Sequence, residues 1–274
     1  MVFPSYGGKH DHEAFVTPQA VLAHRRARGF DLVESVPPAI IVTYQPQLFA
    51  AVLDAESTTP LPVGGPAETV HALDRTDGRV GVVGGFGIGA PVVAVVVEEL
   101  IALGAREIVS VGVAGSLRPE LLVGDVVVAD EAIRDEGVSH HYLRADTPAL
   151  ADLELSDRLE FALAASRLRP CRGPTWTIDA IYRETVAEAR HFAERGALCV
   201  EMEAAALFAI GIVRRAALAA VLCISDSLAG AEWAPQYDSE RLARRLWAAF
   251  HTTVDCLDGR PFEEEDAAYS YDGH

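Results

Sequence analysis

The chain contains 274 residues, of which half are hydrophobic and 23% are charged, and its formal net charge is −17. This composition is ordinary for a packed soluble protein, and no break in it divides the chain into separate domains. The negative charge argues against binding to nucleic acids or to anionic membrane surfaces. A phosphate ligand would need basic residues concentrated near its site.

The spacing of the cysteines and the length of the apolar runs argue against a zinc-binding, redox-active, secreted or membrane-spanning protein. The four cysteines, at positions 171, 199, 223 and 256, form neither a zinc knuckle nor a CxxC redox motif. The first residues lack the basic start and apolar core of a signal peptide. The apolar run 92–103 contains Glu98 and Glu99 and is too short to span a membrane. These features predict a cytoplasmic protein without a metal site.

Residues 1–38 are expected to form an N-terminal arm, with a helical piece near residues 18–28. His10 and His12 would face the same side of a strand and could then bind a metal ion. The favoured alternative is a polar arm surrounded by solvent.

Apolar stretches of two kinds follow the arm. Those rich in branched aliphatic residues are predicted to be strands, and those with apolar residues at three- and four-residue spacing are predicted to be helices. In chain order, strands are expected at 39–43, 80–86, 107–113, 123–129, 197–200 and 217–224, and helices at 92–103, 159–168, 204–212 and 238–257. The alternation predicts a single α/β domain over residues 39–258, with a central mixed, partly barrel-like sheet flanked by helices. An acidic tail is expected at 259–274.

Two connecting segments contain candidate ligand-binding residues. Gly85, Gly87 and Gly89 follow a strand, where glycine lets the backbone approach a ligand, but they fit the dinucleotide pattern G-x-G-x-x-G poorly. Residues 130–150 are expected to form a polar loop in which one of the adjacent residues His140 and His141 could line a pocket.

Two carboxylates bracket a methionine at a predicted strand-to-helix junction, where ligands bind in open α/β sheets. Glu201 or Glu203 could accept two hydrogen bonds from a vicinal diol such as that of ribose, and Met202 could pack against the sugar. The alternative is a helix start whose acidic residues interact favourably with the helix dipole.

A further acidic residue, Asp226, follows Ser225 at the end of the last predicted core strand. A carboxyl side chain can serve as a general acid, which contributes about 10²–10⁴-fold to a reaction rate. The alternative is a helix N-cap.

The run from Val200 to Ala205, taken with the glycine loop and the turn after Val113, resembles motifs of the nucleoside phosphorylase and nucleosidase superfamily. The resemblance extends over residues 39–256. It implies that Glu203 holds the ribose hydroxyls above Met202, with assistance from Glu201. No metal or organic cofactor is implied.

The same resemblance implies how the base is bound. Asp226, after Ser225, would protonate N7 of a departing purine, because Ser-Asp is typical of purine-specific members. In the turn 114–117, Ala114 and Gly115 would lie beside base and sugar, and Gly87 belongs to the matching glycine loop. Ile181 and Tyr182 would cover the base, with Trp176 behind them.

Two charged residues near these segments have simpler expected roles. Arg183 would form an ion pair with Glu184 or Asp179, and the less favoured alternative is that it clamps the ligand. Asp125 would cap a turn.

The residues that bind phosphate or read uracil in related enzymes do not match here. The turn 44–49 lacks the family's Gly-Asp-Pro and the nearby arginine. Ser110 and Val113 stand where phosphorylases place an arginine and a serine or threonine. Thr185 and Ala187 stand near the positions of the glutamine and arginine that read uracil.

We therefore expect an enzyme that cleaves the N-glycosidic bond of a purine-type nucleoside, by phosphorolysis as the family default. Hydrolysis is the alternative that the missing phosphate contacts favour. A non-catalytic nucleoside-binding protein is a further alternative. A dinucleotide oxidoreductase is a distant alternative. The expected partners are a small-molecule nucleoside, inorganic phosphate in the first case, and other copies of the chain in a dimer or a hexamer of three dimers. In such an assembly His10 or His12 could reach a neighbouring site.

Overall fold

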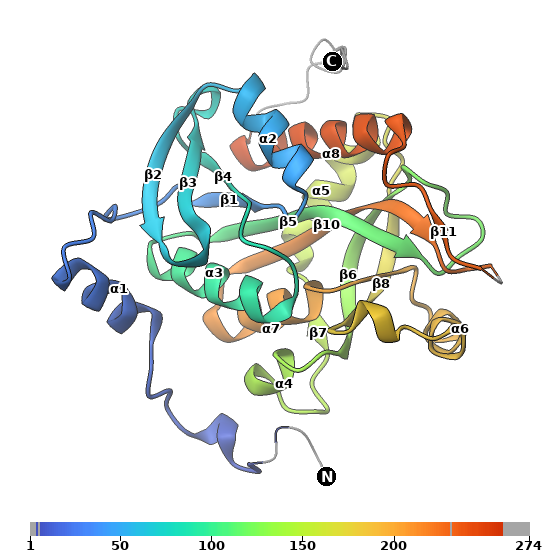
Figure 1. The fold of residues 1–274 in the computed structure, drawn as a ribbon, viewed down its shortest axis with the longest axis horizontal. Helices are drawn as coiled ribbons and strands as arrows, with labels where there is room; N and C mark the ends of the chain where they lie inside the picture. The colour runs from blue at the N-terminus through green and yellow to red at the C-terminus, as the bar shows by residue number, and fades with distance from the viewer. Residues whose placement is uncertain (1–3, 5, 231, 260–274) are drawn as a thin grey trace.

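The computed structural model describes residues 4, 6–230 and 232–259, and its strands form one 11-stranded sheet (Figure 1). Part of this sheet closes on itself, because five strands pair in a ring in the order β5, β10, β6, β8, β9 and back to β5. These strands are β5 (Glu107–Ser116), β6 (Val126–Asp135), β8 (Cys171–Ile178), β9 (Cys199–Glu201) and β10 (Ala217–Ser227). The ring contains parallel and antiparallel pairs, which confirms the predicted mixed, partly barrel-like sheet.

The sheet continues beyond the ring from β5. β1 (Ala39–Val42) and β4 (Val80–Val83) are parallel to it, and the antiparallel hairpin of β3 (Glu68–Leu73) and β2 (Thr58–Gly64) forms the edge. Two short strands, β7 (Ala149–Leu150) and β11 (Ala234–Pro235), pair with β6 and β10.

Helices cover both faces of the sheet, because successive side chains of the buried strands point to opposite faces. The helices of the described chain are α1 (Pro18–Ala27), α2 (Pro46–Ala55), α3 (Ala90–Ala102), α4 (Ser139–Tyr142), α5 (Leu153–Ala165), α6 (Val186–Glu194), α7 (Ala204–Arg214) and α8 (Glu240–Asp258). In β1, Ile40 and Val42 belong to the apolar cluster under α3 and α7, whereas Ala39 and Ile41 belong to the cluster under α2, α5 and α8. Short 3-10 turns lie at η1 (Lys9–Asp11), η2 (Gly65–Ala67), η3 (Asp74–Thr76) and η4 (Ile181–Arg183).

The structure corrects the expected polar loop over residues 130–150. β6 continues to Asp135 because it keeps its pairing with β8 across an irregularity after Ala129. The rest of the segment forms α4 and β7, and it is tied down by Arg134, which donates hydrogen bonds to three backbone carbonyls, those of Leu143, Arg144 and Thr147.

The boundaries of β5 and α5 also differ from expectation. The turn predicted at 114–117 lies largely inside β5, which extends to Ser116 because it pairs there with β9 and β10. α5 begins at Leu153 rather than residue 159, because the Asp152 side chain caps it by accepting a hydrogen bond from the Leu155 N–H.

In the described part of the chain, the structure contains no helix both long and apolar enough to cross a membrane. The acidic tail lies outside the described residues, apart from Gly259, which follows α8 in a left-handed conformation.

Candidate active site

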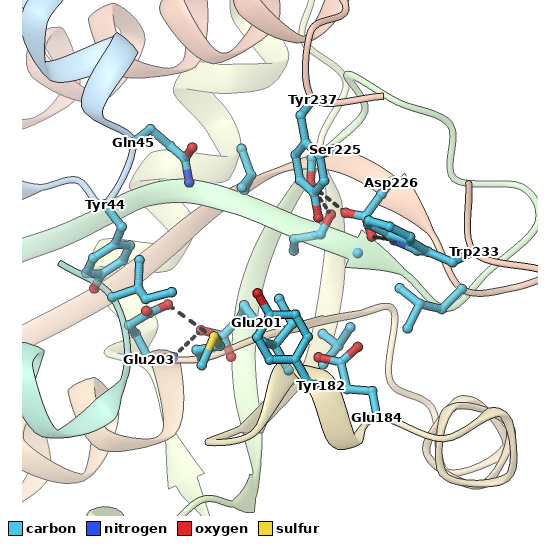
Figure 2. A pocket seen from close by; sticks show the side chains of 18 residues that line it. Tyr44, Gln45, Tyr182, Glu184, Glu201, Glu203, Ser225, Asp226, Trp233 and Tyr237 are labelled. Carbon is cyan, nitrogen blue, oxygen red and sulfur yellow. Dashed lines mark hydrogen bonds between the residues drawn. The ribbon is translucent and has the colours of Figure 1, made fainter. Parts of the chain in front are cut away.

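A cavity of about 470 Å³ lies where β5, β9 and β10 reach their carboxyl ends. Its lining includes nine of the ten candidate residues, which are far apart in the sequence (Figure 2): Ala114, Gly115, Ile181, Tyr182, Glu201, Met202, Glu203, Ser225 and Asp226. The tenth, Gly87, is not among the lining residues. Figure 2 shows Glu203 and Asp226 at opposite sides of the same cavity.

Glu201 ends β9 and organises the start of α7. One carboxylate oxygen accepts hydrogen bonds from the N–H groups of Glu203 and Ala204, at 2.9 and 2.7 Å. The other accepts a hydrogen bond from the Thr177 hydroxyl at 2.6 Å. These contacts satisfy N–H groups that a helix start leaves without partners, so Glu201 has the helix-start role that was the alternative interpretation, although it also lines the cavity.

Glu203 immediately precedes α7, lines the cavity and is 6% exposed. Its carboxylate accepts hydrogen bonds from the N–H groups of Gly89 and Met202. Burial, and then the charge of Glu201, raise the pKa of Glu203. Since each carboxylate oxygen has two acceptor positions, Glu203 can still accept hydrogen bonds from a diol.

The glycine loop acts through Gly89 rather than Gly87. Gly89 has φ +99°, a conformation that favours glycine, and it directs its N–H at Glu203. The loop therefore fixes the carboxylate that the sequence motif singled out.

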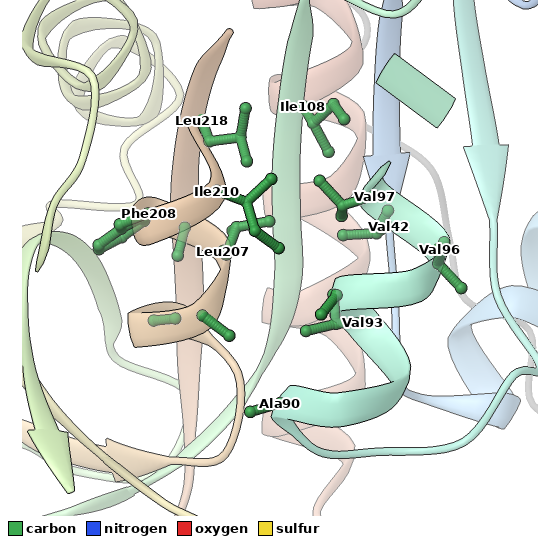
Figure 3. Close-up of a cluster of buried hydrophobic side chains, with 14 of the residues drawn as sticks. Val42, Ala90, Val93, Val96, Val97, Ile108, Leu207, Phe208, Ile210 and Leu218 are labelled. Atoms are coloured by element: carbon green, nitrogen blue, oxygen red, sulfur yellow. The ribbon is translucent and has the colours of Figure 1, made fainter. Parts of the chain in front are cut away.

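Packing on α7 holds this junction in place. Leu207 and Ile210 lie against Val93 and Val97 of α3 and Ile108 of β5 (Figure 3). α7 is buried along most of its length, so the direction in which Glu203 leaves the sheet is set by the core.

Asp226 lies inside β10 and is not a helix N-cap, because the next long helix, α8, begins only after Ser239. Between Ile224 and Asp226 the pairing of β10 with β5 shifts register, and such bulges redirect side chains. The Ser225 hydroxyl donates to one Asp226 oxygen at 2.7 Å, and the Trp233 indole N–H donates to the other at 2.8 Å. Asp226 is thus held facing the cavity by two donors.

Sequence motifs missed several lining residues. Trp233 and Tyr237 come from the segment between β10 and α8, and Tyr237 shares a hydrogen bond with Asp226. Burial raises the pKa of Tyr237 to about 12. Two aromatic side chains in a short connection that follows a candidate site residue were the available signal.

Glu184 also lines the cavity, whereas the sequence suggested for it only an ion pair with Arg183. Burial, the charge of Asp226 and the charge of Glu188 raise the pKa of Glu184 to about 7. Arg183 is exposed and, within the described residues, forms no ion pair with Glu184 or Asp179, which corrects that expectation. Asp179 instead accepts a hydrogen bond from the Gly137 N–H.

The positions matched to the phosphate site carry uncharged side chains. Tyr44, Gln45 and Val113 line the cavity, and Ser110 donates a hydrogen bond to the Tyr44 hydroxyl at 3.3 Å. Burial, followed by the charge of Glu203, raises the pKa of Tyr44. None of the described residues that line the cavity is a lysine, arginine or histidine.

Other residues of interest lie elsewhere. Trp176 is fully buried and stacks on Phe192. His140 and His141 belong to α4, outside the lining of the cavity, and the His10 ring contacts the His140 carbonyl oxygen at 3.0 Å. Asp125 accepts a hydrogen bond from the Leu122 N–H, as expected for a turn cap.

The chain is similar to known proteins in sequence as well as in fold. A family model described as the phosphorylase superfamily matches residues 39–254. A uridine phosphorylase from Treponema pallidum (strain Nichols) is 36% identical over 149 residues, which are 50% of this chain and 58% of that protein. A guanosine phosphorylase from Halorubrum lacusprofundi is 34% identical over 140 residues, which are 51% of this chain and 58% of that protein. The matched segments thus span less than two thirds of these relatives.

The fold comparison agrees with the family match. The crystal structure of purine nucleoside phosphorylase from Toxoplasma gondii in complex with immucillin-H has a TM-score of 0.71 and 22% identity to this chain. The superposition covers 82% of this chain and 92% of that one. The resemblance seen in the sequence is therefore confirmed, and the chain belongs to the phosphorylase superfamily.

Proposed function

We propose that this protein cleaves the N-glycosidic bond of a purine-type nucleoside. The observation that carries the proposal is that Glu203 and Asp226, from distant parts of the chain, line one cavity from opposite sides. A nucleoside has a diol at one end and a heterocycle at the other, so one carboxyl group can bind each end.

The reaction follows from these two positions. Glu203 accepts hydrogen bonds from the 2′- and 3′-hydroxyls, and Met202 packs beneath the sugar. As the bond between C1′ and the base nitrogen breaks, its electron pair stays with the base, and the protonated form of Asp226 donates a proton to N7 and becomes a carboxylate. The sugar becomes oxocarbenium-like, and the carboxylates of the cavity stabilise its positive charge. Tyr182 and Ile181 cover the base.

Two acceptors for the sugar compete. The residues that line the cavity favour water as the acceptor, because phosphate binding usually needs arginine side chains, other cations or free N–H groups at a helix start. No described lining residue is cationic, and the Gly89 N–H is bonded to Glu203. Phosphate is supported by the relatives, which are named phosphorylases. A neighbouring subunit is a further source of a cation.

The deciding experiment is incubation with adenosine, guanosine, inosine and uridine, each with and without phosphate. Free ribose formed without phosphate identifies a hydrolase, and ribose 1-phosphate identifies a phosphorylase. Cleavage of uridine alone would contradict the purine assignment. Binding of nucleosides without any cleavage would identify a non-catalytic binding protein.

We also infer that the chain forms a homo-oligomer. Phe15, Val16, Val95 and Val213 are exposed and line a second hollow, between the N-terminal arm and helices α3 and α7. Exposed apolar residues that gather in one place are typical of interfaces.

A further inference from the structure

The cavity contains a carboxyl group that neither the proposed reaction nor the start of α7 uses. Glu184 follows η4, lines the cavity and is about half buried. Within residues 4, 6–230 and 232–259, no hydrogen bond or ion pair joins its side chain to another residue. A partly buried carboxyl group without a partner is costly, and a ligand that donates hydrogen bonds can supply one.

The groups around Glu184 come from three elements. Besides burial, the charges of Asp226, on β10, and Glu188, on α6, raise its pKa, and its own charge in turn adds to burial in raising the pKa of Tyr237, in the segment before α8. The hydroxyl of Ser225 and the indole N–H of Trp233 both donate to Asp226. This end of the cavity is therefore rich in acceptors, and no described cationic side chain lines it.

Such surroundings discriminate between bases by their hydrogen-bonding groups. Adenine and guanine carry an exocyclic amino group, which donates hydrogen bonds to a carboxylate. Hypoxanthine and uracil carry carbonyls but no amino group, so a ring N–H is the only donor that either base can offer to a carboxylate. A carbonyl oxygen in the place of the amino group is repelled by the carboxylate and removes one of its donors.

We propose that Glu184 is a specificity-determining residue that selects nucleosides with an amino-substituted purine base over those with hypoxanthine or uracil. The proposal rests on the proposed function, since it places the base at the Asp226 end of the cavity. Asp226 meets N7, which all purines share, whereas Glu184 meets the groups that differ between them.

The ionisation of Glu184 gives this selectivity a pH dependence. Burial and the charges of Asp226 and Glu188 raise its pKa to about 7. Above that pH the ionised carboxylate only accepts hydrogen bonds, and below it the protonated group can also donate one to a carbonyl. Selectivity for amino-purines should therefore rise between pH 6 and pH 8.

The test compares wild type with Glu184→Gln and with the control Glu194→Gln, which makes the same change at an exposed position at the end of α6. The measured quantity is the ratio of kcat/KM for the better of adenosine and guanosine to that for inosine. At pH 8 we expect about 10- to 100-fold in wild type and in the control, as for a charged hydrogen bond. In Glu184→Gln the ratio should fall to within about threefold and no longer change with pH, because an amide can donate as well as accept.

Calorimetric binding of the same nucleosides separates this proposal from the proposed function. If no nucleoside is cleaved but amino-purine nucleosides bind more tightly than inosine in a Glu184-dependent way, the selectivity is supported and the reaction is not. If nucleosides are cleaved with the same ratio in wild type and Glu184→Gln, or if inosine is the best substrate, the role of Glu184 is overturned. Failure of all of them to bind overturns both.

Discussion

In the proposed reaction, Asp226 is the residue at which catalysis can be separated from binding. Its side chain is held by Ser225 and Trp233, and asparagine offers an oxygen of similar position but no acidic proton. We expect Asp226→Asn to lower kcat for a purine nucleoside by about 10²–10⁴-fold, the usual contribution of a general acid. Steady-state kinetics measures the change in kcat, and calorimetry measures whether the affinity for the nucleoside is kept.

The exposed Asp238, replaced by asparagine, is the control for that measurement and should leave kcat unchanged. Equal kcat values for Asp226→Asn and wild type would remove the proton donor from the mechanism.

Glu184 makes a second prediction at this scale, on stability. Its folded-state pKa of about 7 lies above the ordinary value of 4.5, so folding favours the neutral form. Its favourable contribution is complete below pH 4.5 and is lost as the pH rises through 7. Glutamine is neutral throughout, so the melting temperature of Glu184→Gln relative to wild type should be higher at pH 8 than at pH 5. A difference that does not change with pH would mean that Glu184 is not buried as described.

Among the elements, α6 has a start that can be tested directly. Thr185 and Glu188 form a capping box, in which the Thr185 hydroxyl accepts from the Glu188 N–H and the Glu188 carboxylate accepts from the Thr185 N–H. We expect Thr185→Ala to cost about 1 kcal/mol of unfolding free energy. Urea denaturation measures this, and Thr185→Ser, which keeps the hydroxyl, should recover most of it.

The strands and helices with strong local patterns were the ones that the sequence could predict. β1, β10 and α8 lie within a few residues of the expected ranges, because a run of branched aliphatic residues or a regular apolar stripe decides each of them. The hairpin of β2 and β3 was not predicted. In β2, Pro60 and Pro62 interrupt the pattern, and its pairing with β3 comes from tertiary contacts that spacing does not reveal.

The residues of the candidate site also divide into those that a local sequence motif reveals and those that only the fold brings together. Glu203 and Asp226 carry side chains whose chemistry is visible in a motif, and so could be proposed from the sequence. Trp233, Tyr237 and Glu184 reach the cavity because their segments fold over it, and nothing in their spacing shows this. The role of Gly89 depends on a single backbone N–H, which the identity of the residue does not reveal.

For the whole molecule, the arm and the exposed apolar hollow predict self-association. We expect sedimentation velocity to give a dimer or a larger multiple of the 29.3 kDa chain. Phe15→Ser, on the exposed part of the arm, should shift the distribution toward smaller species. The matched control is Phe161→Ser on α5, a similarly exposed phenylalanine away from the hollow. A wild-type chain that sediments only as a monomer would contradict the prediction.

The acidic lining of the cavity also determines which metabolites the protein should leave alone. Four carboxyl groups, those of Glu184, Glu201, Glu203 and Asp226, face a space without a cationic lining residue in the described chain. A 5′-phosphate would bring two negative charges into that space. AMP and GMP should therefore survive incubation with the protein while the corresponding uncharged nucleosides are consumed, as chromatography of a mixed sample can show. The proposed cleavage would then be confined to nucleosides and would leave nucleotides intact.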